Sequence, residues 1–257
     1  MTKLNWDHTM INIKDLATAT EILKEKGITF KAGGEHKRWG TGNALGYFGL
    51  NYIELITVAD EKVARTVKRT DGAAVYDAIQ DYFADVQRLN TIAVRSDDIE
   101  ETHRRLKEQG VAVGPIEEGQ RLDPQGKLIS WKIFFVNDHL AQDLPYPFFI
   151  QWKGDDASRF DNLSKQGLIV KHPGGDLRVF AANFEVIEPQ AIAAKWGDLL
   201  QLPVITEDNG SALLKFNERQ LKFTQGTLNH LVSLDFTGAE QELQGQTIKI
   251  DKVTFNF

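Results

Sequence analysis

The sequence contains no cysteine among its 257 residues, and this absence excludes disulfides, thiolate catalysis and cysteine-ligated zinc sites. Long apolar runs are also missing. None approaches the length of a membrane span, and the polar N-terminus lacks the apolar core of a secretory signal. Basic residues do not dominate either, because the formal net charge is −6. We therefore expect a cytoplasmic protein with neither a nucleic-acid partner nor a membrane partner.

What the sequence does contain is the composition of a folded globular protein. Hydrophobic residues make up 42% of the chain and charged residues 26%. A chain of this length can bury one large core or two smaller ones.

A pattern of one strand, one helix and three strands opens the chain. Residues 9–13 read as a strand, Asp15 is placed to cap a helix, and Gly27 is placed to end it. Three further strands follow at 28–30, 44–49 and 52–58. The order β-α-β-β-β indicates an α+β protein built from modules.

The same order recurs along the chain. A second module runs from residue 91 to residue 152, with a hairpin turn at 123–126, and a third begins near residue 177 with Pro189 opening its helix. Residues 228–257 fit a truncated fourth module. We predict paired modules in 1–153, the third and fourth modules in 166–257, and a polar linker at 153–165. An extra helix is predicted within 71–89.

Strand periodicity brings two chemically active side chains to one face. Because side chains alternate along a strand, His8 in the first strand and Glu54 in the last strand of the first module can point inward together. When the second module is aligned with the first, Asn90 corresponds to His8 and Gln151 corresponds to Glu54. The alternative is that His8 and Glu54 form a buried pair without a ligand, and that Asn90 and Gln151 bond only to backbone.

Residues 36–43 combine glycine with hydrogen-bonding and aromatic side chains. In one interpretation this loop lines a pocket, with His36 as a polar group, Trp39 as a wall, and Thr41 and Asn43 beside them. In the other it is a structural turn whose glycines adopt special backbone angles. Both interpretations stay open on sequence grounds.

Several short motifs, taken in order, resemble one known superfamily. They are Asp7-His8, the segment 36–43, the strand 52–55, the strand 147–152 and the segment 172–175. Together they resemble the glyoxalase-like branch of the vicinal oxygen chelate superfamily, which also includes bleomycin-resistance proteins and dioxygenases. The resemblance implies curled mixed sheets around a concave cavity, and a divalent metal held at the inward strand positions.

The resemblance leaves two functions open. One is an enzyme acting on an oxygen-chelating substrate as a lyase, isomerase or dioxygenase, with His8 and Glu54 as catalytic residues. They could also hold Mn, Ni, Zn or Fe, but only weakly, because Asn90 and Gln151 offer neutral oxygens. The other is a small-molecule binding protein without catalysis, which acts as a monomer or homodimer. Predicted ligand-binding residues are His36, Trp39, Thr41, Asn43, Asn90, Trp131, Phe149 and Gln151.

Overall fold

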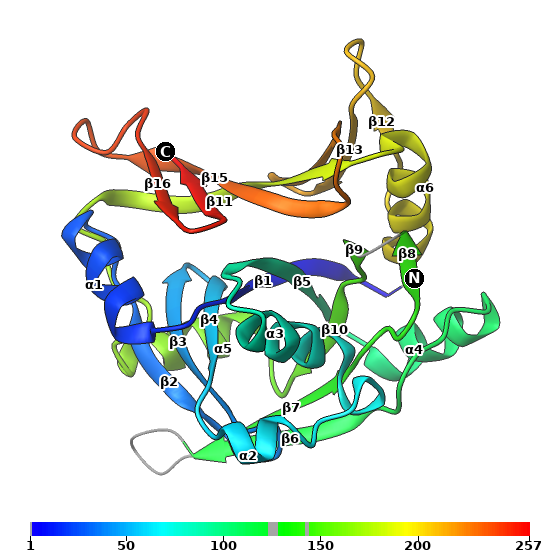
Figure 1. The fold of residues 1–257 in the computed structure, drawn as a ribbon, viewed down its shortest axis with the longest axis horizontal. Coiled ribbons are helices and arrows are strands. Elements are labelled where there is room, and N and C mark those ends of the chain that lie inside the picture. Colours follow the sequence, from blue (N-terminus) through cyan, green and yellow to red (C-terminus); the bar gives the residue numbers. More distant parts are fainter. Residues whose placement is uncertain (1, 123–127, 142–143) are drawn as a thin grey trace.

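The computed structural model describes residues 2–122, 128–141 and 144–257, and two curled sheets contain most of its strands (Figure 1). The first sheet has the order β2-β3-β4-β1-β5-β10-β7-β6. Its strands are β1 (Leu4–Asn12), β2 (Lys31–His36), β3 (Thr41–Phe48), β4 (Asn51–Val58), β5 (Arg88–Ser96), β6 (Glu117–Leu122), β7 (Leu128–Phe134) and β10 (Phe148–Trp152). A small separate hairpin pairs β8 (His139–Ala141) with β9 (Leu144–Pro145).

The second sheet has the order β12-β13-β14-β11-β15-β17-β16. Its strands are β11 (Gly175–Val186), β12 (Ile205–Thr206), β13 (Ala212–Phe216), β14 (Arg219–Gln225), β15 (His230–Ala239), β16 (Thr247–Ile250) and β17 (Val253–Asn256). The helices are α1 (Leu16–Glu25), α2 (Glu61–Ala64), a 3₁₀ turn at Arg69–Asp71, α3 (Ala73–Phe83), α4 (Ile99–Glu108), α5 (Asp156–Lys165) and α6 (Pro189–Leu200).

Strand pairing confirms the predicted modular α+β fold. In the first module β1 runs parallel to β4, and in the second β5 runs parallel to β10. The two modules join where β1 and β5 pair antiparallel, so both first strands lie at the middle of the sheet. The second sheet repeats this pattern, with β11 parallel to β14 and antiparallel to β15. The proposed division of the chain into two domains stays a prediction.

One face of the first sheet packs toward the second sheet, and the other face curls around α3. Side chains from both sheets and from α1, α4 and α6 share a single apolar core. On the concave face, Val75, Ala78 and Ile79 of α3 pack with Met10, Ile56 and other buried residues. Figure 1 shows α3 within the curve of the first sheet. The predicted extra helix therefore occupies much of the expected cavity.

Local signals start and end α1, and start α6, where the sequence predicts. The Asp15 carboxylate accepts from the backbone N–H groups of Ala17 and Thr18, which satisfies two otherwise unpaired donors of α1. Gly27 follows α1 with a φ of 78°, a conformation that glycine adopts without steric cost. Pro189 lies in the first turn of α6, where its missing N–H costs nothing.

Two predicted segments differ in the structure. The strand expected at 28–30 begins only at Lys31, because the Ile28 N–H donates to the Leu23 carbonyl and so completes the end of α1. The segment expected as a linker at 153–165 contains helix α5, which Asp155 caps and which buries Leu163. The predicted turn at 123–126 lies outside the described residues. No helix within the described part of the chain has the length and apolar character needed to cross a membrane.

Candidate functional site

Three charged side chains meet on the concave face of the first sheet. His8 Nδ1 donates to Asp7 Oδ1 over 2.9 Å, and His8 Nε2 lies 3.6 Å from Glu54 Oε2. The side chains of Asp7 and His8 are 0% and 3% exposed, and that of Glu54 is 11% exposed. The predicted pairing of His8 with Glu54 is therefore present, and it is almost fully removed from water.

A bulge in β1 explains how neighbouring residues reach one another. The pairing of β1 with β5 shifts between Trp6 and His8, so Asp7 has no direct partner across the strands. Such a bulge re-aims side chains and often lies beside a functional site. Consecutive residues of a strand normally point to opposite faces. Here the bulge brings the Asp7 carboxylate to the imidazole of His8 even though the two residues are consecutive.

Glu54 connects this pair to the hairpin formed by β2 and β3. Asn43 Nδ2 donates to Glu54 Oε1 over 2.6 Å and lies 3.5 Å from His36 Nε2. The other ring nitrogen of His36 lies 3.0 Å from the Thr41 hydroxyl oxygen. The predicted ligand-binding residues His36, Thr41 and Asn43 thus form one polar chain with Glu54, which continues through His8 to Asp7.

The mutual contacts hold both carboxylates ionised despite burial. Burial alone would raise the pKa of Glu54, but His8, the charge of His36 and the Asn43 amide lower it to about 2. Burial likewise opposes ionisation of Asp7, yet Arg159 and His8 lower its pKa. The pKa of His8 is raised, because its two carboxylate neighbours outweigh the cost of burying the cation. The site is therefore a histidine between two carboxylates that favour its protonated form.

Asp7 also links the site to helix α5. Its carboxylate accepts from Trp152 Nε1 at 3.1 Å and from Arg159 at 3.3 Å. The Arg159 guanidinium lies over the Trp152 ring, 4.4 Å from its centroid. Arg159 Nη2 is buried and has no acceptor among the described residues. Asp7 and Arg159 thus neutralise each other while Arg159 keeps one donor group unsatisfied.

A cavity of about 420 Å³ lies beside Arg159. Its apolar walls come from Tyr47 on β3, Trp152 on β10 and Leu163 on α5. Tyr47 stacks on Tyr52, and Tyr52 stacks on the imidazole of His8 at a centroid distance of 4.3 Å. A stack of rings therefore connects the cavity wall to the charged site.

Two predicted aromatic residues lie on the concave face, as expected. Trp39 packs edge-on against Phe135, and its ring N–H is buried without a partner among the described residues. Trp131 lies with its ring centroid 5.5 Å from that of Trp152, within the apolar cluster of this face.

Asn90 does not join the site. Its Nδ2 donates to the Asp81 carboxylate of α3 over 3.1 Å, so helix α3 takes its hydrogen bond. The prediction that Asn90 lies at the site with His8 is therefore wrong. The sequence predicts the helix, but it does not show which face of the sheet the helix covers.

Phe149 and Gln151 lie on the opposite face from the site. Phe149 is fully buried in the core shared by the two sheets and stacks on Phe134. Gln151 accepts from the Ile99 N–H and donates to the Asp97 carbonyl, which fixes the start of α4. The predicted register of β10 was wrong, because a slip by an odd number of residues moves every side chain to the other face. Phe148, Ile150 and Trp152 line the concave face instead.

The donor set at this site does not fit a resident divalent ion. Among the described residues, no three His, Asp or Glu side chains converge in a metal-binding arrangement. A metal ion normally takes at least three protein ligands. Asp7 and Glu54 raise the pKa of His8 and so favour its protonated form, which has no lone pair for a metal.

Sequence reasoning missed two contributors. Asp7 was noted only as part of a motif, and Arg159 was not placed at the site. An acidic residue directly before a strand histidine is a weak signal for the Asp7 contact. Arg159 lies in a segment whose polar composition suggested a linker, so no signal in the sequence pointed to its role.

Comparison with known proteins places this geometry in a family. The Glyoxalase-like domain family matches residues 6–200. A search of curated proteins gives no match. A solved structure of a hypothetical protein from Staphylococcus aureus aligns over 99% of both chains, with a TM-score of 0.86 and 21% identity.

Two further solved structures share the fold at lower similarity. The Mn(II)-bound glyoxalase from Novosphingobium aromaticivorans aligns with a TM-score of 0.50 and 14% identity, over 92% of this chain and 66% of that one. A mutant of 4-hydroxymandelate synthase from Streptomyces coelicolor gives a TM-score of 0.53 and 10% identity, over 92% and 71%. The chain therefore belongs to the Glyoxalase-like domain family and has the vicinal oxygen chelate fold.

Proposed function

We propose that this chain binds a small organic molecule beside Arg159 on the concave face, without a resident metal ion. The ligand has a flat apolar body and an oxygen acceptor. The observation that carries the proposal is the buried, unsatisfied Nη2 donor of Arg159, a residue that lines a cavity with aromatic walls. Pockets of this kind, largely apolar with a few placed polar groups, are typical of small-molecule sites.

Each part of the ligand corresponds to a feature of the cavity. Trp152 and Tyr47 offer ring faces for a planar group. Arg159 offers one free donor for a carbonyl, carboxylate or hydroxyl oxygen, since its other contacts are with Asp7. The oxygen-bearing ligand agrees with the superfamily's preference for oxygen-rich substrates.

The enzyme alternative gives Glu54 the role of proton acceptor and His8 that of proton donor. A carboxylate with a pKa of about 2 is a weak base near neutral pH, because an efficient general base has a pKa close to the working pH. This favours the binding alternative over acid–base catalysis at Glu54.

The test uses calorimetric titration with 2-naphthoate, which combines a planar apolar body with a carboxylate. Binding should be unchanged by a chelator and by added Mn²⁺. The Arg159→Lys variant keeps the charge facing Asp7 but loses the forked donor, and should bind about tenfold more weakly. Arg104→Lys, on the exposed face of α4, is the matched control.

Two results would contradict the proposal. One is binding that requires a divalent ion. The other is equal affinity in the unaltered protein and in Arg159→Lys, with both proteins folded by circular dichroism.

A further inference from the structure

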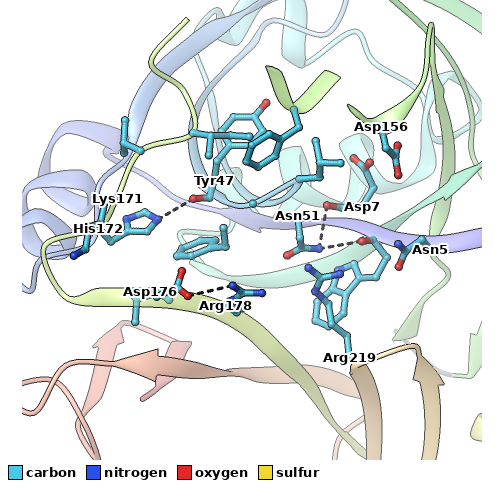
Figure 2. Close-up of a pocket in the computed structure, with 18 of the residues that line it drawn as sticks. Asn5, Asp7, Tyr47, Asn51, Asp156, Lys171, His172, Asp176, Arg178 and Arg219 are labelled. Atoms are coloured by element: carbon cyan, nitrogen blue, oxygen red, sulfur yellow. Dashed lines mark hydrogen bonds and ion pairs between the residues drawn. The ribbon is translucent and has the colours of Figure 1, made fainter. Parts of the chain in front are cut away.

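A second and larger cavity lies where the first sheet meets strand β11. Its volume is about 620 Å³, and β1, β4, β5, α5, β11 and β14 all contribute to its lining. Figure 2 shows Arg178 and Arg219 reaching into it from the side of the second sheet, with Asn51 facing them. Arg219 lies beyond residue 200, so the cavity includes a part of the chain that the family match does not cover.

Three arginines share this cavity, and one lacks a counter-ion. Arg95 pairs with Asp156 at 2.8 Å, and Arg178 pairs with Asp176 at 3.1 Å. The ion pairs within the described residues include none for Arg219, whose Nε donates to a backbone carbonyl, that of Val179.

The surroundings of Arg219 disfavour its own charge. Burial lowers the pKa of its guanidinium and the charges of Arg95 and Arg178 lower it further, while the charge of Glu218 raises it. An arginine stays protonated in proteins even so. The folded protein therefore carries a partly desolvated cation without an ion-pair partner among the described residues, and an anionic ligand would neutralise it.

The remaining carboxylate of the lining does not supply that neutralisation. Asp7 lines this cavity too, but its side-chain oxygens already accept from His8, Trp152 and Arg159. Lys171 adds a further positive charge to the wall.

Asn51 contributes an unsatisfied acceptor opposite the arginines. Its Nδ2 donates to the carbonyls of Trp6 and Asp7, at 3.1 Å and 3.0 Å. Because both partners are acceptors, the amide orientation is fixed and Oδ1 must face away from them. Oδ1 is buried without a donor among the described residues, in a side chain of a residue only 2% exposed. Asn5, which also lines the cavity, has the same unsatisfied oxygen.

We propose that this cavity binds a small organic anion that also carries hydroxyl or amino groups. A carboxylate or phosphate monoester of the ligand would contact Arg219, and a hydroxyl or amino group would donate to Asn51. The site is separate from the one beside Arg159, so each proposal can fail while the other holds.

The experiment is calorimetric titration of the full chain with two matched pairs of probes. Glycerol 3-phosphate is compared with propyl phosphate, and glycerate with propionate, so that each pair differs in hydroxyl groups alone. The hydroxylated member of each pair should bind more tightly, and glycerol should not bind. The preferred pair identifies the phosphate or the carboxylate as the anionic group. Because the hydroxyl group is varied in the probe and Asn51 is not mutated, the hydrogen bonds from Asn51 to the backbone stay intact.

Arg219→Gln tests the anion contact. This variant should bind the preferred probe about tenfold more weakly or worse. Arg65→Gln, at the exposed residue that follows the last turn of α2, should bind like the unaltered protein. Without a probe, Arg219→Gln should melt at the same temperature or higher, since it relieves repulsion with Arg95 and Arg178.

The proposal is overturned if no probe gives saturable binding, or if Arg219→Gln binds as tightly as the unaltered protein. Equal affinity within both pairs overturns the role of Asn51. A lower melting temperature for Arg219→Gln, with no change in probe binding, would identify Arg219 as purely structural.

Discussion

Replacing Glu54 with Gln tests the charged site most directly. The substitution keeps the shape of the side chain and an oxygen for Asn43, but removes the negative charge facing His8. The pKa of Glu54 falls from 4.5 to about 2 in the folded protein. That difference corresponds to about 3 kcal/mol of folding free energy at neutral pH.

The pH dependence follows from the direction of this shift. A carboxyl group with a lowered folded pKa contributes its full stabilisation above its unfolded pKa, here 4.5, and loses it as pH falls toward about 2. Glu54→Gln should therefore be up to about 3 kcal/mol less stable than the unaltered protein at pH 7. The difference should shrink to about 1.5 kcal/mol at pH 3.

The assay is urea unfolding of both proteins at pH 7, 5, 4 and 3. Glu21→Gln is the matched control, because Glu21 lies on the exposed side of α1 and pairs with Lys24 on the surface. An NMR titration adds a second readout, since the pKa of His8 should fall when Glu54 loses its charge. Equal stability of Glu54→Gln and the unaltered protein at pH 7, or a gap that does not narrow toward pH 3, would refute this account of the site.

Three further predictions concern other parts of the chain. Gln151→Glu should create no metal site, and it should lower the melting temperature because a carboxylate would replace the amide that donates to the Asp97 carbonyl. Calorimetric titration with Mn²⁺ checks the first expectation and a thermal melt checks the second. Tight Mn²⁺ binding would contradict the placement of Gln151 outside the site. His230 is partly buried, and this burial lowers its pKa to about 3, so the stability of the folded protein is full above pH 6.5 and declines on acidification. When the pH falls from 6 to 4, the free energy of unfolding of His230→Leu should therefore decrease by about 1 kcal/mol less per pH unit than that of the unaltered protein, as measured by urea unfolding. An equal pH dependence of the two proteins would contradict this prediction. Asp15→Ala should cost about 1 kcal/mol through loss of the α1 cap, measured at pH 7, whereas an unchanged midpoint would show the cap to be dispensable.

The sequence alone determined the modular plan, because that plan depends on local chemistry. Caps such as Asp15, the glycine after α1 and Pro189 in the first turn of α6 act on their own backbone. Strand alternation, read correctly in β4, brought Glu54 to the same face as His8. The helix within 71–89 was also evident from its apolar spacing.

Tertiary structure decided the site itself, since its members depend on register and on segments distant in the chain. The register of β10 takes Gln151 away from the site and places Trp152 beside Asp7. Helix α3 fills the concave face and engages Asn90, which no local pattern specifies. The bulge at Asp7 and the docking of Arg159 join residues 152 positions apart. Only the folded chain brings Arg95, Arg178 and Arg219 together, because they come from three strands in two sheets.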